Sequence, residues 1–400
     1  MKNRILLATF DMEVGGVERS LLNMLNDWDY ERHNINLLLY RHQGAFMEFL
    51  SNQANLIKEI PEYATFRKSV KELVAEKNFK IAYTRVLAKW KAKQFAKASN
   101  FSDSGYLQMQ LMWKYALPYL PQLNEEYDAA ISYLWPHYFV AEKVKARKKI
   151  AWIHTDYSTI DTNIELDLEM WNKFDDIVAV SEACREAFLK KYKPLEAKVS
   201  VIENINSPDY VKKMAKEKVE NQMMQDNRFK LCTVARLSHA KGIDQAVRAL
   251  RILKDKGHDN IAWYVVGYGG DEGEIRRLIN DLGVGDQFIL LGKQINPYPY
   301  IKACDLYVQP SRYEGKAVTV TEAKILGKPV IITSYPTASS QIVDGVDGVI
   351  AELNPEGITK EIIRLINNKT LRQALINNTK NSNYSNIQEL NRLYELCQEV

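Results

Sequence analysis

The sequence predicts an α/β fold built from two domains with parallel sheets. Strand-like apolar runs alternate with helical segments along almost all of the 400 residues, which is the pattern of βαβ units. A chain of this length exceeds what one compact core usually holds, so two domains are expected. A polar, charged stretch over residues 207–228 separates two series of strands and predicts a linker.

Each strand is expected where a short apolar run is bounded by turn residues. In the first half these runs are Arg4–Thr9, Ile35–Tyr40, Leu56–Ile60, Tyr127–Tyr133, Ile150–His154, Ile177–Ser181 and Val199–Asn204. In the second half they are Phe229–Val234, Ile261–Val266, Gln287–Leu291, Leu306–Gln309, Val330–Thr333 and Val349–Leu353. From about residue 62 to residue 120 helical, basic sequence replaces the alternation, and we interpret it as an insertion. The domains are therefore expected at residues 1–206 and 229–386, with a last helix over 387–400.

The composition is that of an ordinary globular protein, with 46% hydrophobic and 26% charged residues. A net charge of +4 is mild, and we expect no nucleic-acid partner. The four cysteines are widely spaced without a CxxC pair, which favours reduced thiols over disulfides or a zinc site. The chain begins in a short strand rather than a signal peptide, and no apolar run approaches the ~18 residues that span a bilayer. A cytoplasmic protein is expected, at most peripheral to the inner face of the cell membrane.

Two glutamates, Glu314 and Glu322, lie eight positions apart and are the most informative residues of the chain. The apolar run before Glu314 predicts a buried strand, and Val318–Leu326 predicts a helix that ends at Gly327. Glu314 is therefore expected in a loop at the carboxyl end of a strand, where open α/β sheets bind ligands. The N–H groups at the start of the helix favour an anion such as phosphate. Because carboxylates accept hydrogen bonds from hydroxyls, the combination indicates a sugar attached to a phosphate.

Two cations lie near the start of the second domain. Arg236 follows the strand Phe229–Val234, and Lys241 with Gly242 opens the next helix. An arginine fork, a lysine charge and a helix N-terminus at one place suit a pyrophosphate. The plainer alternative is that Arg236 forms a surface ion pair and Lys241 only begins a helix, but the paired glutamates favour the functional interpretation.

The spacing Glu314-x7-Glu322, with Gly315 and Ala323, resembles the signature of the retaining family-4 glycosyltransferases, which have the GT-B fold. The similarity continues through the motifs Gly15-Gly16-x-Glu18, His154, Val180-Ser181-Glu182, Ala235-Arg236-Leu237, Lys241-Gly242, Val266-Gly267-x-Gly269 and Gly345-x-x-Gly348. The resemblance implies two Rossmann-like domains facing each other across a cleft, with the last helix crossing back onto the first domain.

The resemblance also implies roles for individual residues. Arg236 and Lys241 would stabilise the departing nucleoside diphosphate. Glu314 would face the donor hexose and Glu322 would hold the ribose hydroxyls. His154 would lie beside the hexose, although a structural histidine is the alternative. The expected catalytic residues are Glu314, Arg236, Lys241 and His154, and the expected substrate-binding residues are Gly15, Gly16, Gly267, Gly315, Lys316, Ala317, Val318 and Glu322.

Two other patterns point to different chemistry. The glycines Gly267, Gly269 and Gly273 follow a strand, but their spacing is GxGxxxG, and the next strand ends in Gly292-Lys293 rather than in an acidic residue. A NAD site is therefore not expected. Asp27-Trp28-Asp29 matches a metal-binding DxD pattern, but it follows a helix at the opposite end of the predicted sheet. We expect neither a metal ion nor a cofactor.

The insertion carries a cationic stripe. Arg85, Lys89, Lys93 and Lys97 repeat every four residues on a predicted helix, and like charges at this spacing destabilise an isolated helix by roughly a few tenths of a kcal/mol per pair. An anionic partner would offset that cost, which indicates contact with anionic lipid headgroups or with a phosphate-bearing acceptor. A solvated helix face is the alternative.

Together these features predict a hexosyltransferase that uses a nucleotide diphosphate sugar, expected to be a UDP-sugar. The resemblance implies transfer with retention of configuration to a glycan or lipid-linked glycan of the cell envelope. One alternative keeps the fold but changes the reaction, to a sugar-nucleotide epimerase or a phosphorylase. The other is a non-catalytic sugar-nucleotide-binding protein, against which the intact Arg236, Lys241, Glu314 and Glu322 argue.

Overall fold

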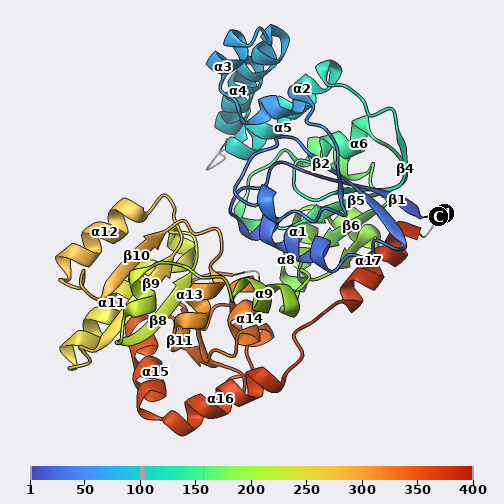
Figure 1. The fold of residues 1–400 in the computed structure, drawn as a ribbon. Coiled ribbons are helices and arrows are strands. Elements are labelled where there is room, and N and C mark those ends of the chain that lie inside the picture. Colours follow the sequence, from blue (N-terminus) through green and yellow to red (C-terminus); the bar gives the residue numbers. More distant parts are fainter. Residues whose placement is uncertain (1, 100–103, 156, 315, 399–400) are drawn as a thin grey trace. The chain divides into compact units, whose positions relative to one another are not determined.

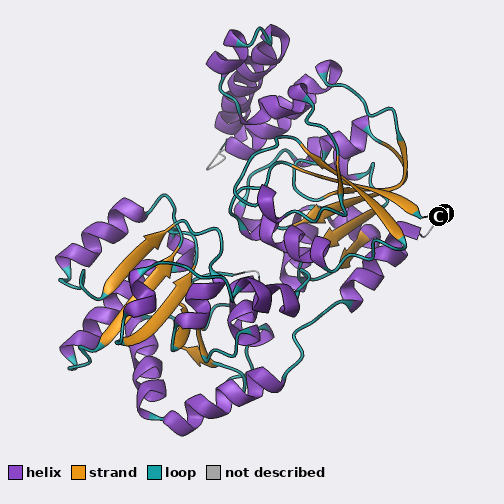
Figure 2. Ribbon diagram, viewed as in Figure 1, coloured by secondary structure: helices purple, strands orange, loops and turns teal. Residues whose placement is uncertain are grey.

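The computed structural model describes residues 2–99, 104–155, 157–314 and 316–398. They form two compact units, coloured along the chain in Figure 1 and by secondary structure in Figure 2. Unit 1 consists of Met1–Ile205 and Ile387–Val400, and unit 2 of Asn206–Asn386. Each unit contains one parallel sheet with helices, so the predicted α/β fold class is confirmed.

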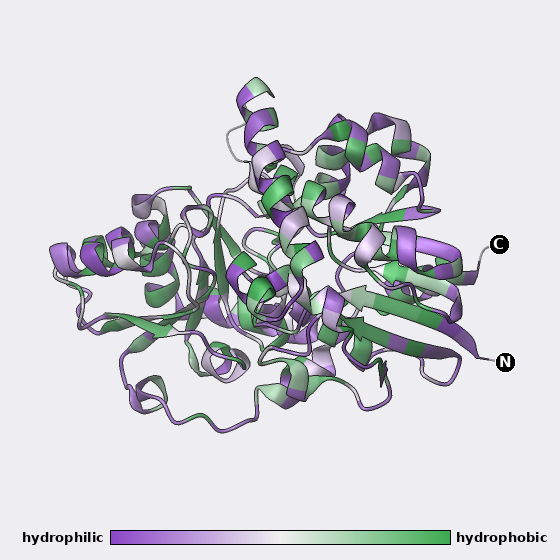
Figure 3. Cartoon of the chain, turned by 90° about the horizontal axis from the view of Figure 1, so that it is seen from above, coloured by the Kyte–Doolittle hydropathy of each residue, from purple (hydrophilic) through white to green (hydrophobic). Residues whose placement is uncertain are grey.

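The sheet of unit 1 has the strand order β3-β2-β1-β4-β5-β6-β7. In register, Leu7 of β1 lies opposite Leu37 of β2 and Ile131 of β4, and all three are buried. Figure 3 shows hydrophobic residues concentrated along the strands, as expected for parallel sheets covered on both faces. The strands are β1 (Asn3–Thr9), β2 (His33–Leu39), β3 (Asn55–Leu56), β4 (Glu126–Ser132), β5 (Lys145–Ile153), β6 (Asp176–Ala179) and β7 (Val199–Val201).

The helices of unit 1 fall into two groups. Those that alternate with strands are α1 (Gly16–Asn26), α6 (Tyr138–Lys143), α7 (Ile164–Trp171) and α8 (Glu182–Lys191), with α17 (Gln388–Gln398) at the end of the chain. Those of the insertion are α2 (Pro61–Ala64), α3 (Val70–Ala75), α4 (Phe79–Ser99) and α5 (Gly105–Ala116).

Unit 2 has the strand order β10-β9-β8-β11-β12-β13. Its strands are β8 (Phe229–Val234), β9 (Ile261–Val266), β10 (Phe288–Gly292), β11 (Leu306–Gln309), β12 (Val330–Thr333) and β13 (Val349–Ala351). Its helices are α9 (Pro208–Met214), α10 (Gln222–Gln225), α11 (Ile243–Asp255), α12 (Glu272–Asp281), α13 (Tyr298–Ala303), α14 (Val318–Ile325), α15 (Pro355–Asn367) and α16 (Lys369–Asn381).

Both sheets reverse their strand order at one point, between β1 and β4 in unit 1 and between β8 and β11 in unit 2. In doubly wound sheets the loops at the carboxyl ends of the two strands beside this point diverge, and ligands bind there. Within each unit, the candidate ligand-binding loops are therefore those that follow these two strands.

The segment expected to be a linker, residues 207–228, is instead part of unit 2. It forms α9 and α10, which pack against α13 and α14. Although the segment is mostly polar, the apolar side chains of Val211, Met214 and Met223 are buried. Helix α17, in contrast, packs on unit 1, where the ring of Tyr394 stacks on His33 with centroids 4.3 Å apart and its hydroxyl accepts from the Asp29 N–H at 2.8 Å.

Strands β3 and β5 differ most from expectation, and β7 (Val199–Val201) ends three residues before the expected Val199–Asn204. Strand β3 has only two residues where five were expected, Leu56–Ile60. Strand β5 begins at Lys145 rather than at Ile150, because its charged residues are neutralised by neighbouring strands. Arg147 pairs with Asp128 of β4, and Lys148 Nζ lies 2.9 Å from Asp176 Oδ2 of β6.

Candidate active site

In unit 2 the predicted residues converge where the strand order reverses. Lys241 lies in the connection from β8 to α11, and Glu314 lies in the connection from β11 to α14. Lys241 Nζ is 2.6 Å from Glu314 Oε2, although 73 positions separate them in the chain. The fold thus joins two residues that the sequence had marked independently.

The Glu314 carboxylate is buried, with 5% of the residue exposed. Its Oε1 accepts hydrogen bonds from Ser311 Oγ at 2.6 Å and from Gln309 Nε2 at 3.1 Å. With the Lys241 ammonium, three donors hold the carboxylate in one orientation at the edge of the sheet. Gln309 and Ser311 were not predicted as site residues from the sequence, although polar side chains at the end of an apolar strand are a signal for such a role.

Arg312 fastens the loop after β11 to the start of α11. Its guanidinium donates to both carboxylate oxygens of Asp244, at 2.7 and 2.6 Å, and to the carbonyl of His239 at 2.8 Å. Burial alone would raise the pKa of Asp244, but the bonds and the charge of Arg312, together with backbone N–H groups, lower the pKa of that carboxyl. Because Lys241 lies in the sequence between His239 and Asp244, Arg312 fixes the backbone that carries it.

Arg236 is exposed directly after β8, and it forms no ion pair within the described ranges. Its backbone is fixed by the end of β9 and the loop after it, since the Ala235 N–H donates to the Val266 carbonyl at 3.1 Å and the Leu237 N–H donates to the Tyr268 carbonyl at 3.0 Å. Gly267 has φ +150°, and a Cβ there would lie 1.8 Å from the Ala235 carbonyl oxygen. Only glycine allows this approach, so Gly267 supports the position of Arg236 from within the protein.

Glu322 lies one turn inside α14 with 2% of the residue exposed. Its Oε1 accepts a hydrogen bond from Tyr298 Oη at 2.9 Å. Tyr298 was not selected from the sequence, since it lies on α13 and nothing local links it to Glu322. The two predicted carboxylates therefore have different surroundings: Glu314 contacts a cation, and Glu322 contacts a phenol.

The start of α14 differs in one detail from expectation. Ala317 is the N-cap residue and supplies no side-chain cap, but its N–H donates to Gln341 Oε1 at 3.0 Å. One of the amides expected to face an anion is therefore bonded within unit 2. Val318 begins the helix and Lys316 is half-buried beside it, whereas Gly315 lies outside the described residues.

In unit 1 the predicted glycines lie at the carboxyl edge of the sheet. Gly15 is the N-cap residue of α1 and provides no side-chain cap. A Cβ on Gly16 would meet no atom within 4 Å. Unit 1 itself therefore does not require glycine at position 16, and the space beside it is open.

His154 follows β5, and its ring centroid lies 4.6 Å from that of Tyr133, which follows β4. Its Nε2 is buried without a hydrogen-bond partner among the described residues. Burial lowers the pKa of His154 to about 3, so the ring is neutral near pH 7 and keeps one donor and one acceptor nitrogen.

A second histidine, His137, lies near His154 and was not predicted from the sequence. It is fully buried, with Nδ1 2.8 Å from Ser132 Oγ. Burial, with His154 nearby, lowers the pKa of His137 to about 3. Its ring packs on Trp171 rather than at the surface, so its contribution is structural.

A cavity of about 240 Å³ opens at the same edge of unit 1. One charged side chain reaches it, Arg67, which lies 3.2 Å from Asp11 Oδ2 and over the ring of Phe10. Aromatic walls with few polar groups suit the apolar face of a sugar or a lipid chain. The loops after β1, β4 and β5 and the insertion supply its lining: Phe10, Phe66, Arg67, Tyr106, Met109, Met112, Trp113, Leu134, Trp135, Thr155, Tyr157 and Ile160.

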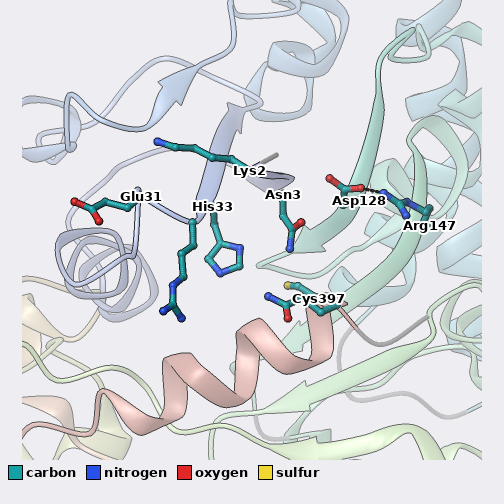
Figure 4. Close-up of a pocket in the computed structure, with 9 residues that line it drawn as sticks. Lys2, Asn3, Glu31, His33, Asp128, Arg147 and Cys397 are labelled. Carbon is teal, nitrogen blue, oxygen red and sulfur yellow. Dashed lines mark hydrogen bonds and ion pairs between the residues drawn. The ribbon is translucent and has the colours of Figure 1, made fainter.

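A larger cavity, about 760 Å³, lies at the opposite, amino end of the unit 1 strands. Figure 4 shows its polar lining, with Lys2, Asn3 and His33 on one side and the Asp128–Arg147 ion pair on the other. Because open α/β sheets bind ligands at the carboxyl ends of their strands, we do not include it in the candidate active site. Within the described ranges, no group of three or more His, Cys, Asp or Glu residues is arranged to hold a metal ion.

Comparison with known proteins agrees with this geometry. Residues 214–382 match the family model described as "Glycosyl transferases group 1". The chain is 29% identical over 266 residues to the uncharacterized glycosyltransferase MJ1069 of Methanocaldococcus jannaschii. The aligned residues make up 61% of this chain and 66% of the relative. The chain is 26% identical over 208 residues to the N,N'-diacetylbacillosaminyl-diphospho-undecaprenol alpha-1,3-N-acetylgalactosaminyltransferase of Campylobacter jejuni, covering 50% of this chain and 54% of that enzyme.

Among solved structures, HepE of Anabaena in complex with UDP-glucose is similar over 98% of both chains, with a TM-score of 0.67 and 17% sequence identity. The fold is GT-B. The residues that match the group 1 model, 214–382, all lie in unit 2.

Within the GT-B fold, the residues predicted from the sequence fall into two sets. Lys241 and Glu314 are in contact, and Arg236, Gly267 and Glu322 lie in the same unit, within the residues that match the group 1 model. Gly15, Gly16 and His154 lie in the other domain, at the carboxyl edge of its sheet.

None of the described helices has both the length and the apolar character needed to cross a bilayer.

Proposed function

We propose that this protein is a hexosyltransferase that moves a hexosyl group from a UDP-sugar to a glycan or lipid-linked glycan with retention of configuration. The observation that carries the proposal is the ion pair between Lys241 and Glu314 where the strand order of a group 1 domain reverses. At that place the cation can bind the phosphate of a sugar nucleotide, and the buried carboxylate can accept hydrogen bonds from its hydroxyls.

Unit 2 binds the donor in this proposal. As the bond between the anomeric carbon and the diphosphate breaks, negative charge grows on the leaving phosphate, and fixed positive groups lower the barrier. Arg236 is exposed and unpaired among the described residues, so its whole charge is available to the diphosphate. Lys241 is partly neutralised by Glu314, which orients the ammonium. We assign the hexose to Glu314 and the ribose to Glu322.

Unit 1 binds the acceptor in this proposal. Neutral His154 has one buried ring nitrogen without a partner among the described residues, and it hydrogen-bonds a sugar hydroxyl. The aromatic cavity beside Thr155 accommodates a sugar ring or the first part of a lipid. The name of the Campylobacter relative includes a diphospho-undecaprenol acceptor, which supports an acceptor of that class here.

The proposal includes metal-independent transfer, since Arg236, Lys241 and the N-termini of α11 and α14 supply positive potential. Activity should persist when EDTA is added. Complete loss of transfer on chelation, with recovery on adding Mn²⁺ or Mg²⁺, would contradict this part of the proposal.

The decisive experiment is a donor screen followed by transfer. We expect UDP-sugars to raise the unfolding temperature, because a ligand at a hundred times its Kd adds about 2.7 kcal/mol of stability. The stabilising donor, radiolabelled in the hexose, should then label a lipid-linked glycan extract, and proton NMR of the product should show the donor's anomeric configuration. Hydrolysis or isomerisation of the donor without labelling would favour the epimerase alternative, and release of a sugar phosphate from a glycan by inorganic phosphate would favour the phosphorylase alternative. No stabilisation by any sugar nucleotide would overturn the proposal.

A further inference from the structure

Helix α4 of the insertion has two apolar faces, and only one of them is covered. Its inner face, which includes Ile81, Ala88 and Ala92, is buried. Its outer face exposes four large apolar side chains that we call the outer stripe: Phe79 (61% exposed), Tyr83 (67%), Val86 (55%) and Trp90 (52%). Their spacing of four, three and four positions places them in one line along the helix.

The same helix is strongly cationic. Its 21 residues include five lysines and Arg85 and contain no acidic residue. Lys89, Lys93 and Lys97 are exposed and form no ion pair with any residue that the structure describes. At about 100° per residue, Lys93 and Lys97 continue the line of the outer stripe, and Lys89 flanks it.

Arg85 does not belong to this surface, which corrects the cationic stripe expected from the sequence. It is buried and donates to the carbonyl of Lys68 at 2.7 Å and to that of Thr65. The four-residue repeat drifts around a helix of 3.6 residues per turn, so Arg85 turns inward while Lys93 and Lys97 face outward. Arg85 therefore anchors α4 to the preceding segment.

Neighbouring helices support the helix that carries the outer stripe. Helix α3 begins with a capping box, in which Ser69 and Glu72 each accept from the other's backbone N–H, and it packs against α4. Figure 1 shows α3 and α4 together at one extremity of unit 1, with α5 beside them. The exposed apolar side chains are thus held in line by ordered helices rather than by a loop.

We propose that α4 binds the surface of an anionic lipid bilayer. A row of aromatic and aliphatic side chains needs an apolar partner, and unpaired lysines along the same line need a negatively charged one. The headgroup region of an anionic membrane offers both within a few ångströms of depth. The complete absence of acidic residues from α4 favours this surface over a second copy of the chain, whose α4 would repel it.

Membrane binding would also specify the acceptor, and this step rests on the proposed function. Helix α4 packs on α5, and α5 contributes Tyr106, Met109 and Trp113 to the aromatic cavity. A bilayer bound at α4 is therefore one helix away from the cavity that we assign to the acceptor. This places a lipid-linked acceptor, rather than a soluble oligosaccharide, within reach.

Three variants test the inference with vesicles made of equal parts phosphatidylcholine and phosphatidylglycerol. The first replaces the outer stripe by serine (Phe79→Ser, Tyr83→Ser, Val86→Ser, Trp90→Ser). The second neutralises three lysines (Lys89→Gln, Lys93→Gln, Lys97→Gln). The matched control removes exposed apolar side chains of unit 2 (Val343→Ser, Val346→Ser).

We expect the wild type and the control to sediment with anionic vesicles equally. Each lysine near such a surface changes partitioning about fivefold, so the second variant should bind roughly a hundredfold more weakly, and salt should weaken wild-type binding. The first variant should lose binding while sugar-nucleotide stabilisation stays unchanged, which shows that unit 2 remains folded. Brominated lipid should quench the wild type more than a Trp90→Phe variant.

Equal vesicle binding by all proteins, or no binding by the wild type at low salt, would overturn the inference. If the wild type were an oligomer in solution and the outer-stripe variant were a monomer, the membrane inference would be overturned in favour of self-association. Vesicle binding is measured without donor and donor binding without vesicles, so failure of the lipid inference leaves the proposed transferase activity testable, and the converse also holds.

Discussion

The ion pair between Lys241 and Glu314 joins a half-buried ammonium to a carboxylate that is almost fully buried. Removing one partner of a buried pair leaves an uncompensated charge, which costs roughly 3–5 kcal/mol in fully buried cases. The cost here is smaller because Lys241 reaches solvent. Glu314→Gln can keep an acceptor oxygen for Ser311 and Gln309. It removes the charge and replaces the oxygen that accepts from Lys241 by an amide NH2, so it changes the shape of the side chain little and separates function from folding.

Arg236→Ala should impair transfer far more than folding. The guanidinium is exposed and has no ion-pair partner among the described residues, so its loss leaves no buried group unsatisfied. Loss of charge-assisted hydrogen bonds to the diphosphate, each roughly 1.5–3 kcal/mol, should lower kcat by roughly ten- to a hundredfold or more. Steady-state kinetics and the unfolding temperature measure the two effects, and near-normal transfer by the variant would remove Arg236 from the site.

Glu314→Gln should lower kcat more than Glu322→Gln. We assign Glu314 to the hexose, where charge develops as the bond breaks, and Glu322 to the ribose, which is bound equally in the ground and transition states. Glu322→Gln should therefore mainly raise KM for the donor. Tyr298→Phe is the control for Glu322, because it removes the 2.9 Å bond to Oε1 and leaves the carboxylate in place. If Glu322→Gln lowered kcat more than Glu314→Gln, the two roles would have to be exchanged.

At the scale of elements, three loops position the donor residues. The loop after β9 fits closely against the loop after β8 at Gly267, and Arg312 joins the loop after β11 to α11. These attachments are made by backbone atoms and by a bidentate ion pair, which allow little adjustment. Small changes at their contact points should therefore move the functional side chains.

Gly267→Ala should destabilise unit 2 and weaken donor binding together. The new methyl group would lie 1.8 Å from the Ala235 carbonyl oxygen, and relieving that overlap should cost roughly 1–3 kcal/mol or more. Urea unfolding and donor titration measure both effects. Gly273→Ala is the matched control, since a Cβ there meets no atom within 4 Å and alanine favours the helix α12. Equal behaviour of the two variants would contradict the role given to Gly267.

At the scale of the whole molecule, buried histidines make the stability of unit 1 depend on pH. Burial lowers the pKa of both His137 and His154 to about 3, whereas the ordinary value is about 6.5. Below about pH 6.5 the unfolded chain binds protons that the folded chain does not, so stability falls as the pH falls toward 3. Asp167 opposes this trend, because burial raises its pKa to about 6 and the folded state then binds the extra proton. As the pH falls, the two histidines therefore lower the free energy of unfolding by more than Asp167 raises it.

His137→Gln should remove part of this dependence. Between about pH 7 and pH 5 one histidine with these values accounts for roughly 2 kcal/mol of lost stability. We expect the wild type to lose more unfolding free energy over that interval than the variant, measured by urea unfolding with tryptophan fluorescence. Should the variant fold poorly, the imidazole of wild-type His137 can be titrated directly by NMR. A ring that protonates near pH 6.5 in the folded protein would refute the argument.

The sequence by itself determined most of the fold. Strands Phe229–Val234, Ile261–Val266, Leu306–Gln309 and Val330–Thr333 have the predicted bounds, because a strand buried on both faces must be an uninterrupted apolar run. The end of α14 was also predicted from a local feature, because Gly327, just after the helix, has φ +67°, a left-handed conformation that favours glycine. Strand β5 was predicted too short, because its charges pair with residues on other strands.

Only the tertiary structure decided which residues meet and which face water. Sequence spacing could not place Lys241 against Glu314, or Tyr298 against Glu322, since these pairs come from separate elements joined by the strand order. It placed Arg85 on a cationic surface, although packing turns that side chain inward and leaves Phe79, Tyr83, Val86 and Trp90 outside. Local patterns specify elements because backbone geometry repeats along the chain, whereas burial depends on the neighbour that covers each face, and that neighbour is set by the fold.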